Sequence, residues 1–198
     1  MSVLSVSLSP THSFSKSPVS SITLIPNLGV QGDAHAGQTV QHLSRLHIKP
    51  PPPNLRQVHL IHCELLASVS TSSGSTTTGK PLQPGDLGEN ITTTGLELLA
   101  LGKGTKLRFV VDDDGNMSGG EVAGAGAVVE VQGLRNPCPQ IDKFQNGLKE
   151  KLVVRDANRA VVGRLAGIMG TVEAGGDIRP GMRIVVEKPA VYRKLECV

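Results

Sequence analysis

Residues 82–111 read L-Q-P-G-D-L-G-E-N-I-T-T-T-G-L-E-L-L-A-L-G-K-G-T-K-L-R-F-V-V. A glycine turn over residues 84–90 leads into Ile91, and a second turn at Gly102 and Gly104 leads into a strand predicted for residues 105–111. Apolar runs this short, each bounded by Gly or Pro, are typical of strands joined by tight turns.

The same pattern extends in both directions from this stretch. Residues 64–69 are predicted to form a short helix, and so are residues 140–151, where Ile141, Phe144 and Leu148 share one helical face. Many short strands with one or two helices predict a mainly β fold, a barrel or sandwich rather than a βαβ protein. The further predicted strands cover residues 3–8, 19–25, 56–61, 127–132, 161–168, 170–172 and 178–186.

The length of 198 residues suits one domain spanning residues 1–198. Low-complexity residues 70–80 and acidic residues 112–120 are expected to be mobile surface loops. The run K-P-P-P-P at residues 49–53 cannot be helical, and the length of the 70–80 loop suggests an insertion.

Composition excludes several classes of function. The net charge is only +3 with scattered cations, and the chain has no Trp and one Tyr, so nucleic-acid binding is not expected. No apolar run approaches the roughly 20 residues of a membrane span, and no signal peptide is evident, so the expected location is the cytoplasm. Three cysteines without a C-x-x-C pair do not predict a disulfide scaffold or a structural zinc site.

Cys138 is the most informative single residue. Pro137 and Pro139 bracket it, Arg135 lies three positions upstream, and a predicted helix follows. A thiol beside an arginine and a helix start is expected to be rich in thiolate, which suits a soft-metal ligand or a nucleophile. A buried, inert cysteine is the alternative, and the local sequence leaves both open. Cys63 is expected in the core, and Cys197 has no expected role.

Two glycine segments, residues 29–37 and 84–90, place glycines beside acids. Glycine allows close backbone approach to a ligand, although ordinary turns use the same residues. Several histidines could suggest a metal site, but their spacing favours surface or turn positions. These candidates are His35, His42, His47, His59 and His62.

Taken in order, the motifs resemble the MOSC family, the C-terminal domain of molybdenum cofactor sulfurases and its stand-alone relatives. The short stand-alone bacterial members are the most similar in length, and the insertions at residues 49–53 and 70–80 and Met182 depart from the pattern. The matching stretches are S-K-S-P-V near Lys16, L-G-V-Q-G-D-A-H-A-G from Leu28, R-Q-V-H-L-I from Arg56, L-Q-P-G-D-L-G-E-N-I-T-T-T-G-L from Leu82, L-R-N-P-C-P from Leu134 and G-D-I-R-P-G-M-R-I-V-V from Gly176.

This resemblance implies a β-barrel whose Cys138 ligates molybdenum of the molybdenum cofactor (Mo-molybdopterin). It implies an oxidoreductase that detoxifies small N-hydroxylated compounds, such as hydroxylaminopurines, by reducing them to amines with an electron-donor protein. The alternatives are a sulfur carrier, whose Cys138 persulfide a desulfurase would load, and a non-catalytic cofactor-binding module. The residues expected to hold the cofactor are Gly32, Asp33, His35, Arg56, Gln57, Gly85, Gly88, Glu89, Asn90 and Arg135.

Overall fold

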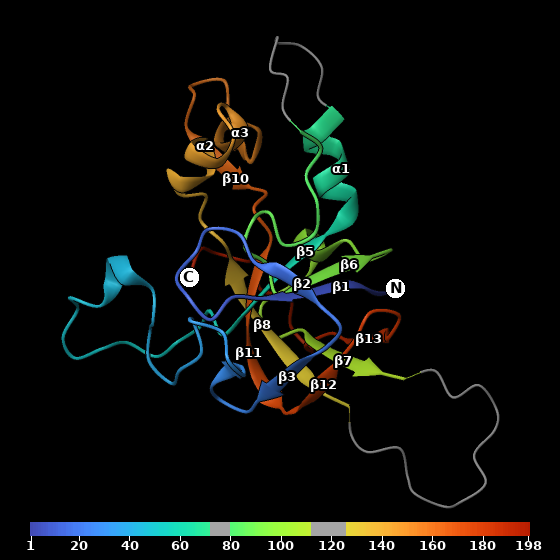
Figure 1. The fold of residues 1–198 in the computed structure, drawn as a ribbon. Coiled ribbons are helices and arrows are strands. Elements are labelled where there is room, and N and C mark those ends of the chain that lie inside the picture. The colour runs from blue at the N-terminus through green and yellow to red at the C-terminus, as the bar shows by residue number, and fades with distance from the viewer. Residues whose placement is uncertain (72–79, 112–125) are drawn as a thin grey trace, which may run out of the picture.

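The computed structural model describes residues 1–71, 80–111 and 126–198, and a closed β-barrel forms its centre (Figure 1). The mainly β prediction is therefore confirmed. The barrel strands are β1 (Ser2–Leu8), β5 (Val58–His62), β6 (Ile91–Thr94), β7 (Lys106–Val110), β8 (Val128–Leu134), β11 (Ile168–Ala174) and β13 (Arg183–Glu187).

The strands follow one another around the barrel in the order β13-β7-β8-β11-β5-β6-β1. A β1–β13 pairing between Ser2 and Arg183 closes the ring. The β5–β6 pair is parallel, whereas the other pairings of these strands are antiparallel. Closure leaves the barrel strands with few unpaired edges.

Smaller elements surround the barrel. Figure 1 shows the three α-helices and β10 beyond one end of the barrel, with β3 and β12 toward the other. Strand β2 (Ser17–Val19) pairs with β1, and two small sheets have the orders β12-β3-β4 and β10-β9. The remaining elements are β3 (Ile22–Ile25), β4 (Gly29–Val30), β9 (Val153–Arg155), β10 (Val161–Arg164), β12 (Gly176–Ile178), α1 (Cys63–Thr71), α2 (Gln140–Phe144), α3 (Leu148–Lys151) and the 3-10 turns η1 (Leu43–Arg45) and η2 (Leu98–Ala100).

The first strand shows how the pattern and the structure differ in detail. A bulge in the pairing of β1 with β6 falls between Val3 and Ser5. Val3 and Val6, three residues apart, can therefore both face the core, while Leu4 is exposed. The predicted strand is correct, but its buried face depends on the bulge.

The predicted helix over residues 140–151 is wrong as one element. The chain forms two short helices, α2 and α3, separated by a left-handed turn at Gly147 with a φ of 75°. Ile141 and Leu148 still reach the core, but Phe144 is 41% exposed. The break follows from glycine, which tolerates positive φ and weakens a helix.

Two apolar clusters fill the molecule. The larger lies inside the barrel, and Phe109 and Leu107 are fully buried in it. The smaller joins α1, α2 and α3 to one end of the barrel through Leu66, Ile141 and Leu148, and Cys138 packs against it. The segment that carries Cys138 is thus anchored by apolar packing.

The two predicted loops fall mostly outside the described residues. Residues 72–79 and 112–125 are not described, which includes all of the loop predicted for 112–120. Helix α1 runs to Thr71, so residues 70–71 belong to a helix and not to the predicted loop. Among the described helices, none combines the length and apolar character needed to cross a membrane.

Candidate functional site

A cavity of about 220 Å³ collects side chains from many separate segments of the chain. Its wall includes the segment after β1, the long 34–56 connection, β5, the turn before β6 and the segment after β8. Six of the predicted site residues line it: His35, Arg56, Gly88, Asn90, Arg135 and Cys138.

Cys138 lies at the cavity wall, half-buried, with Pro137 buried beside it. Its carbonyl accepts a hydrogen bond from the Ile141 amide at 3.1 Å, which begins the turn into α2. Because α2 has only five residues, its dipole is small, and the predicted helix-start effect on the thiol is weaker than the sequence suggested. The charge near this thiol comes mainly from Arg135.

Arg135 links Cys138 to the turn before β6. Its guanidinium donates a hydrogen bond to the Leu87 carbonyl and lies 5.8 Å from the centroid of the Phe14 ring, and it interacts electrostatically with Cys138. Burial lowers the pKa of Arg135, while the charges of Cys138 and Glu89 act in the opposite direction. Arg135 therefore places a positive charge beside Cys138 at the cavity wall.

Further cations face the same space. Arg56 donates from Nε to the main-chain oxygen of Val198 at 2.7 Å. Burial, followed by the charges of Arg45 and Arg135, lowers the pKa of Arg56 to about 10. Burial and the neighbouring Arg56 lower the pKa of His42 to about 4. Mutual repulsion among these groups marks the cavity as a place where an anion would be stabilised.

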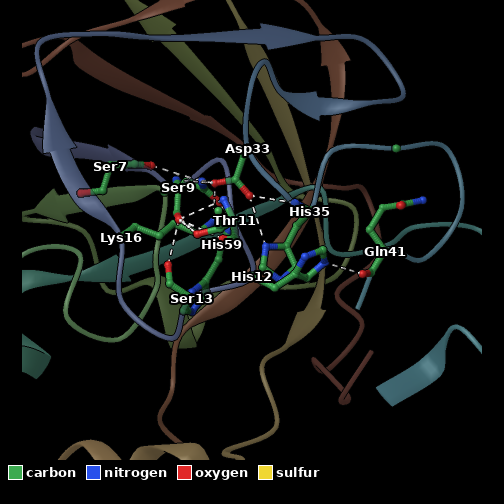
Figure 2. A network of polar contacts seen from close by, with 12 residues as sticks. Ser7, Ser9, Thr11, His12, Ser13, Lys16, Asp33, His35, Gln41 and His59 are labelled. Atoms are coloured by element: carbon green, nitrogen blue, oxygen red, sulfur yellow. Dashed lines mark hydrogen bonds and ion pairs between the residues drawn. The ribbon is translucent and has the colours of Figure 1, made fainter. Parts of the chain in front are cut away.

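A buried polar network supports one side of the cavity (Figure 2). Nζ of Lys16 lies 2.7 Å from Oδ2 of Asp33, and both side chains are almost fully buried. The same oxygen accepts a hydrogen bond from Asn90 Nδ2 at 3.0 Å, and Oδ1 accepts one from the His35 amide at 3.0 Å. Asp33 thus joins the first glycine segment to the second.

Burial would raise the pKa of Asp33, but the hydrogen bond from His35 and the charge of Lys16 hold it well below its ordinary value. Burial lowers the pKa of Lys16, against the attraction of Asp33. The low pKa of Asp33 keeps its carboxylate ionised, and this charge lies 2.7 Å from Lys16 Nζ and offsets the charge of that side chain. The unpaired positive charge of the cavity belongs mainly to its arginines.

Five of the predicted residues lie behind the cavity wall or beside it. Asp33 acts through Lys16, His35 and Asn90, as described. The side-chain amide of Gln57 hydrogen-bonds within the protein and does not face the cavity. Nε2 donates to the Asn27 carbonyl and Oε1 accepts from the Val172 amide, each at 2.8 Å. Gly32, Gly85 and Glu89 likewise do not line the cavity.

Glu89 is an interior group. It is fully buried, and its Oε1 accepts from the Gly85 amide at 2.7 Å and from Thr92 Oγ1 at 3.1 Å. Its Oε2 has no hydrogen-bond partner among the described residues. Burial raises the pKa of Glu89. The Glu89 carboxyl group therefore stabilises the turn before β6 through these hydrogen bonds.

The histidines do not all occupy the expected surface or turn positions. His59 and His62 are buried, because β5 runs through the barrel wall. His59 Nε2 lies 2.8 Å from the Ala166 carbonyl, and burial lowers its pKa. Within residues 1–71, 80–111 and 126–198, no group of three His, Cys, Asp or Glu side chains is arranged to hold a metal ion.

Sequence reasoning gave no role to Arg45, and it considered His42 only as a possible metal ligand, although both line the cavity. One signal could have indicated them: residues 34–63 contain no Asp or Glu, yet they carry two arginines, a lysine and five histidines. A stretch so depleted of acids favours an anion-binding surface.

Comparisons with known proteins agree with this architecture. A family model described as "MOSC domain" matches residues 31–185. The YuaD protein from Bacillus subtilis superposes with a TM-score of 0.70 at 21% identity, over 95% of this chain and 96% of that one. YiiM from Escherichia coli superposes with a TM-score of 0.58 at 16% identity, over 98% and 73%. YiiM from Geobacillus stearothermophilus gives 0.55 at 16%, over 94% and 73%. No curated protein sequence matches the chain.

Proposed function

Because the chain belongs to the MOSC domain family, we propose that its cavity binds the molybdenum cofactor with the Cys138 thiolate as a ligand of molybdenum. The observation that carries the proposal is the meeting of one thiol with Arg45, Arg56 and Arg135 in a single cavity. When bound, the cofactor would supply the oxygen-atom transfer that reduces an N-hydroxylated compound to an amine.

The chemistry of the donor set fits this cofactor. Its phosphate and dithiolene groups are anionic, and the described residues of the cavity wall include three arginines and no Asp or Glu. Arginine forks suit phosphate, and a thiolate suits a soft metal. Gly88 and Asn90 also line the cavity wall.

The chain's own residues would hold and orient the ligand. Arg135, which lies beside Cys138 at the cavity wall, would place a positive charge near the sulfur. Arg56 would balance the negative charge from the opposite segment, and the anchored Pro137–Pro139 turn would fix the position of the sulfur. A one-electron donor protein would supply the reducing equivalents.

The test is metal and pterin analysis of the protein purified from a host that makes the cofactor. We expect wild type to carry molybdenum and pterin, and Cys138→Ser to stay folded but lose most of the metal. Cys63→Ser and Cys197→Ser are matched controls, because neither thiol lines the cavity. Both variants should retain the molybdenum.

Other outcomes contradict the proposal in distinct ways. A persulfide on Cys138 without bound metal would identify a sulfur carrier. Pterin and metal without any reduction of an N-hydroxylated substrate by reduced viologen would identify a binding module. Metal content that is equal in Cys138→Ser and wild type would remove Cys138 from the site.

A further inference from the structure

We propose that Asp33 and His35 form an acid–base pair, in which Asp33 positions the His35 imidazole so that its Nε2 delivers a proton to a substrate in the cavity. This inference rests on the proposed function, because it assigns the proton donor for the reduction of an N–OH group. It gives Asp33 and His35 a role distinct from holding the cofactor.

The geometry begins with a carboxylate that cannot move freely. The Asp33 side chain is 2% exposed, and its Oδ2 contacts Lys16, Asn90 and the Ser9 amide. Its Oδ1 contacts the His35 amide at 3.0 Å and the ring Nδ1 at 3.2 Å. The carboxylate is therefore fixed from one side and oriented toward His35 on the other.

An ionised carboxylate at this place sets the tautomer of the ring. It accepts hydrogen bonds only, so His35 Nδ1 must carry the hydrogen that faces it. The other nitrogen, Nε2, is then the atom that gains and loses a proton. The His35 side chain is 27% exposed and lines the cavity. This arrangement is the one in which a carboxylate orients a histidine for proton transfer.

Other titratable groups also face His35. The His12 ring lies edge-on with a centroid distance of 5.0 Å, and the His42 ring is at 6.0 Å. His12 Nε2 is 2.9 Å from the Gln41 carbonyl, which holds that ring at the rim of the network (Figure 2). Burial and Arg56 lower the pKa of His42 to about 4, so its ring is neutral near pH 7. Lys16 is paired with the same carboxylate.

The reaction requires protons as well as electrons. Reduction of R–NHOH breaks the N–O bond and consumes two electrons and two protons, giving R–NH₂ and water. We assign one proton to His35 Nε2 and the other to solvent, and His35 regains its proton from water at the open side of the cavity. The electrons come from the one-electron donor protein, or from reduced viologen in an assay. A positioned acid is worth about 10²–10⁴-fold in rate.

The first test uses cofactor-free wild-type protein, in which ¹⁵N NMR reads the tautomer of His35. The assignment uses His35→Gln to identify the signals. We expect the neutral ring to carry its hydrogen on Nδ1. A hydrogen on Nε2 instead would overturn the pair, whether or not the protein binds a cofactor.

The second test measures turnover of cofactor-loaded protein at several pH values with reduced viologen. We expect His35→Gln to lower kcat about 100-fold, to change KM and molybdenum content little, to lose the alkaline limb of the pH profile, and to recover partly with added imidazole. The control is His47→Gln, an exposed histidine of the same connection that does not line the cavity.

The outcomes separate this inference from the proposed function. If wild type binds no molybdenum, the proposed function fails, and so does the assignment of a substrate proton. If wild type is active but His35→Gln keeps its kcat, or loses kcat only in proportion to lost molybdenum, the acid–base pair alone is overturned.

Discussion

Asp33 and Glu89 are two buried carboxyl groups with opposite surroundings. Hydrogen bonds and Lys16 outweigh burial at Asp33 and depress its pKa, whereas burial dominates at Glu89 and raises its pKa. Asp33 therefore stabilises the fold above its ordinary pKa of 3.8, and that stability is lost as the pH falls below this value. Glu89 has the opposite effect on the pH dependence of stability, because the folded protein holds the Glu89 proton more tightly than the unfolded chain does.

Glu89→Gln tests that difference. In wild type, Glu89 costs stability as the pH rises above its ordinary value of 4.5. Gln keeps an oxygen for the Gly85 amide and Thr92 but cannot ionise. We expect the variant to gain about 1–3 kcal/mol over wild type between pH 4 and pH 8, measured by urea unfolding. Below pH 4 the two proteins should lose stability in parallel through the unchanged Asp33. Parallel curves over the whole range would contradict the raised pKa of Glu89.

At the level of elements, the turn before β6 packs against the loop after β1. The Lys16 amide donates to the Gly85 carbonyl at 2.9 Å. A Cβ at Gly85 would lie 2.3 Å from the Lys16 carbonyl oxygen, and one at Gly88 would lie 2.4 Å from the Phe14 carbonyl oxygen. The sequence suggested glycine here for approach to a ligand, but the closest approach is to the chain's own backbone.

Gly88→Ala and Gly181→Ala separate backbone conformation from packing. Both glycines have positive φ, 76° and 90°, but a Cβ at Gly181 meets nothing within 4 Å. We expect Gly181→Ala to cost about 1–2 kcal/mol of unfolding free energy from conformation alone. Gly88→Ala should cost more, because the Phe14 backbone must also move. Chemical denaturation with a common m-value measures both. Equal losses of unfolding free energy would show that the Phe14 backbone moves at little energetic cost.

For the whole molecule, the barrel core carries stability, while the smaller cluster positions the site. The barrel interior is closed on every side by paired strands. The smaller cluster under α1, α2 and α3 holds the segment with Cys138, and Phe14 packs against it. Stability and site geometry therefore depend on different parts of the core.

Substitution of two phenylalanines tests whether stability and site geometry depend on different parts of the core. Phe109 is fully buried in the barrel, so Phe109→Ala should cost about 3–5 kcal/mol. Phe144 is exposed on one side and contacts Phe14 with ring centroids 5.4 Å apart, so Phe144→Ala should cost only about 1 kcal/mol. Phe14 lies under Arg135, so the second variant should also change the reactivity of Cys138 toward an alkylating reagent. An unchanged alkylation rate would show that the Phe14–Phe144 contact does not affect Cys138.

Much of this architecture could be predicted from local patterns. Period-2 apolar runs and Gly or Pro turns indicated most barrel strands, because strand pleat and turn conformation depend on neighbouring residues. The break at Gly147 and the bulge in β1 were not predicted, since helical spacing and alternation alone do not show where a competing turn or pairing interrupts them. The two glycine segments and Cys138 were also visible as candidates in the sequence.

The sequence by itself therefore determined a mainly β fold of short strands, a cysteine held between prolines, and a resemblance to a family of β-barrels. Only the tertiary structure decided which charges meet. Lys16, Arg45, Arg56 and Arg135 are separated along the chain, yet the first pairs with Asp33 and the others face the cavity beside Cys138. It also turned Glu89 and Gln57 inward, where buried amides needed acceptors. The charge and accessibility of a polar group depend on what lies within a few ångströms in space, and neighbours along the chain do not define those contacts.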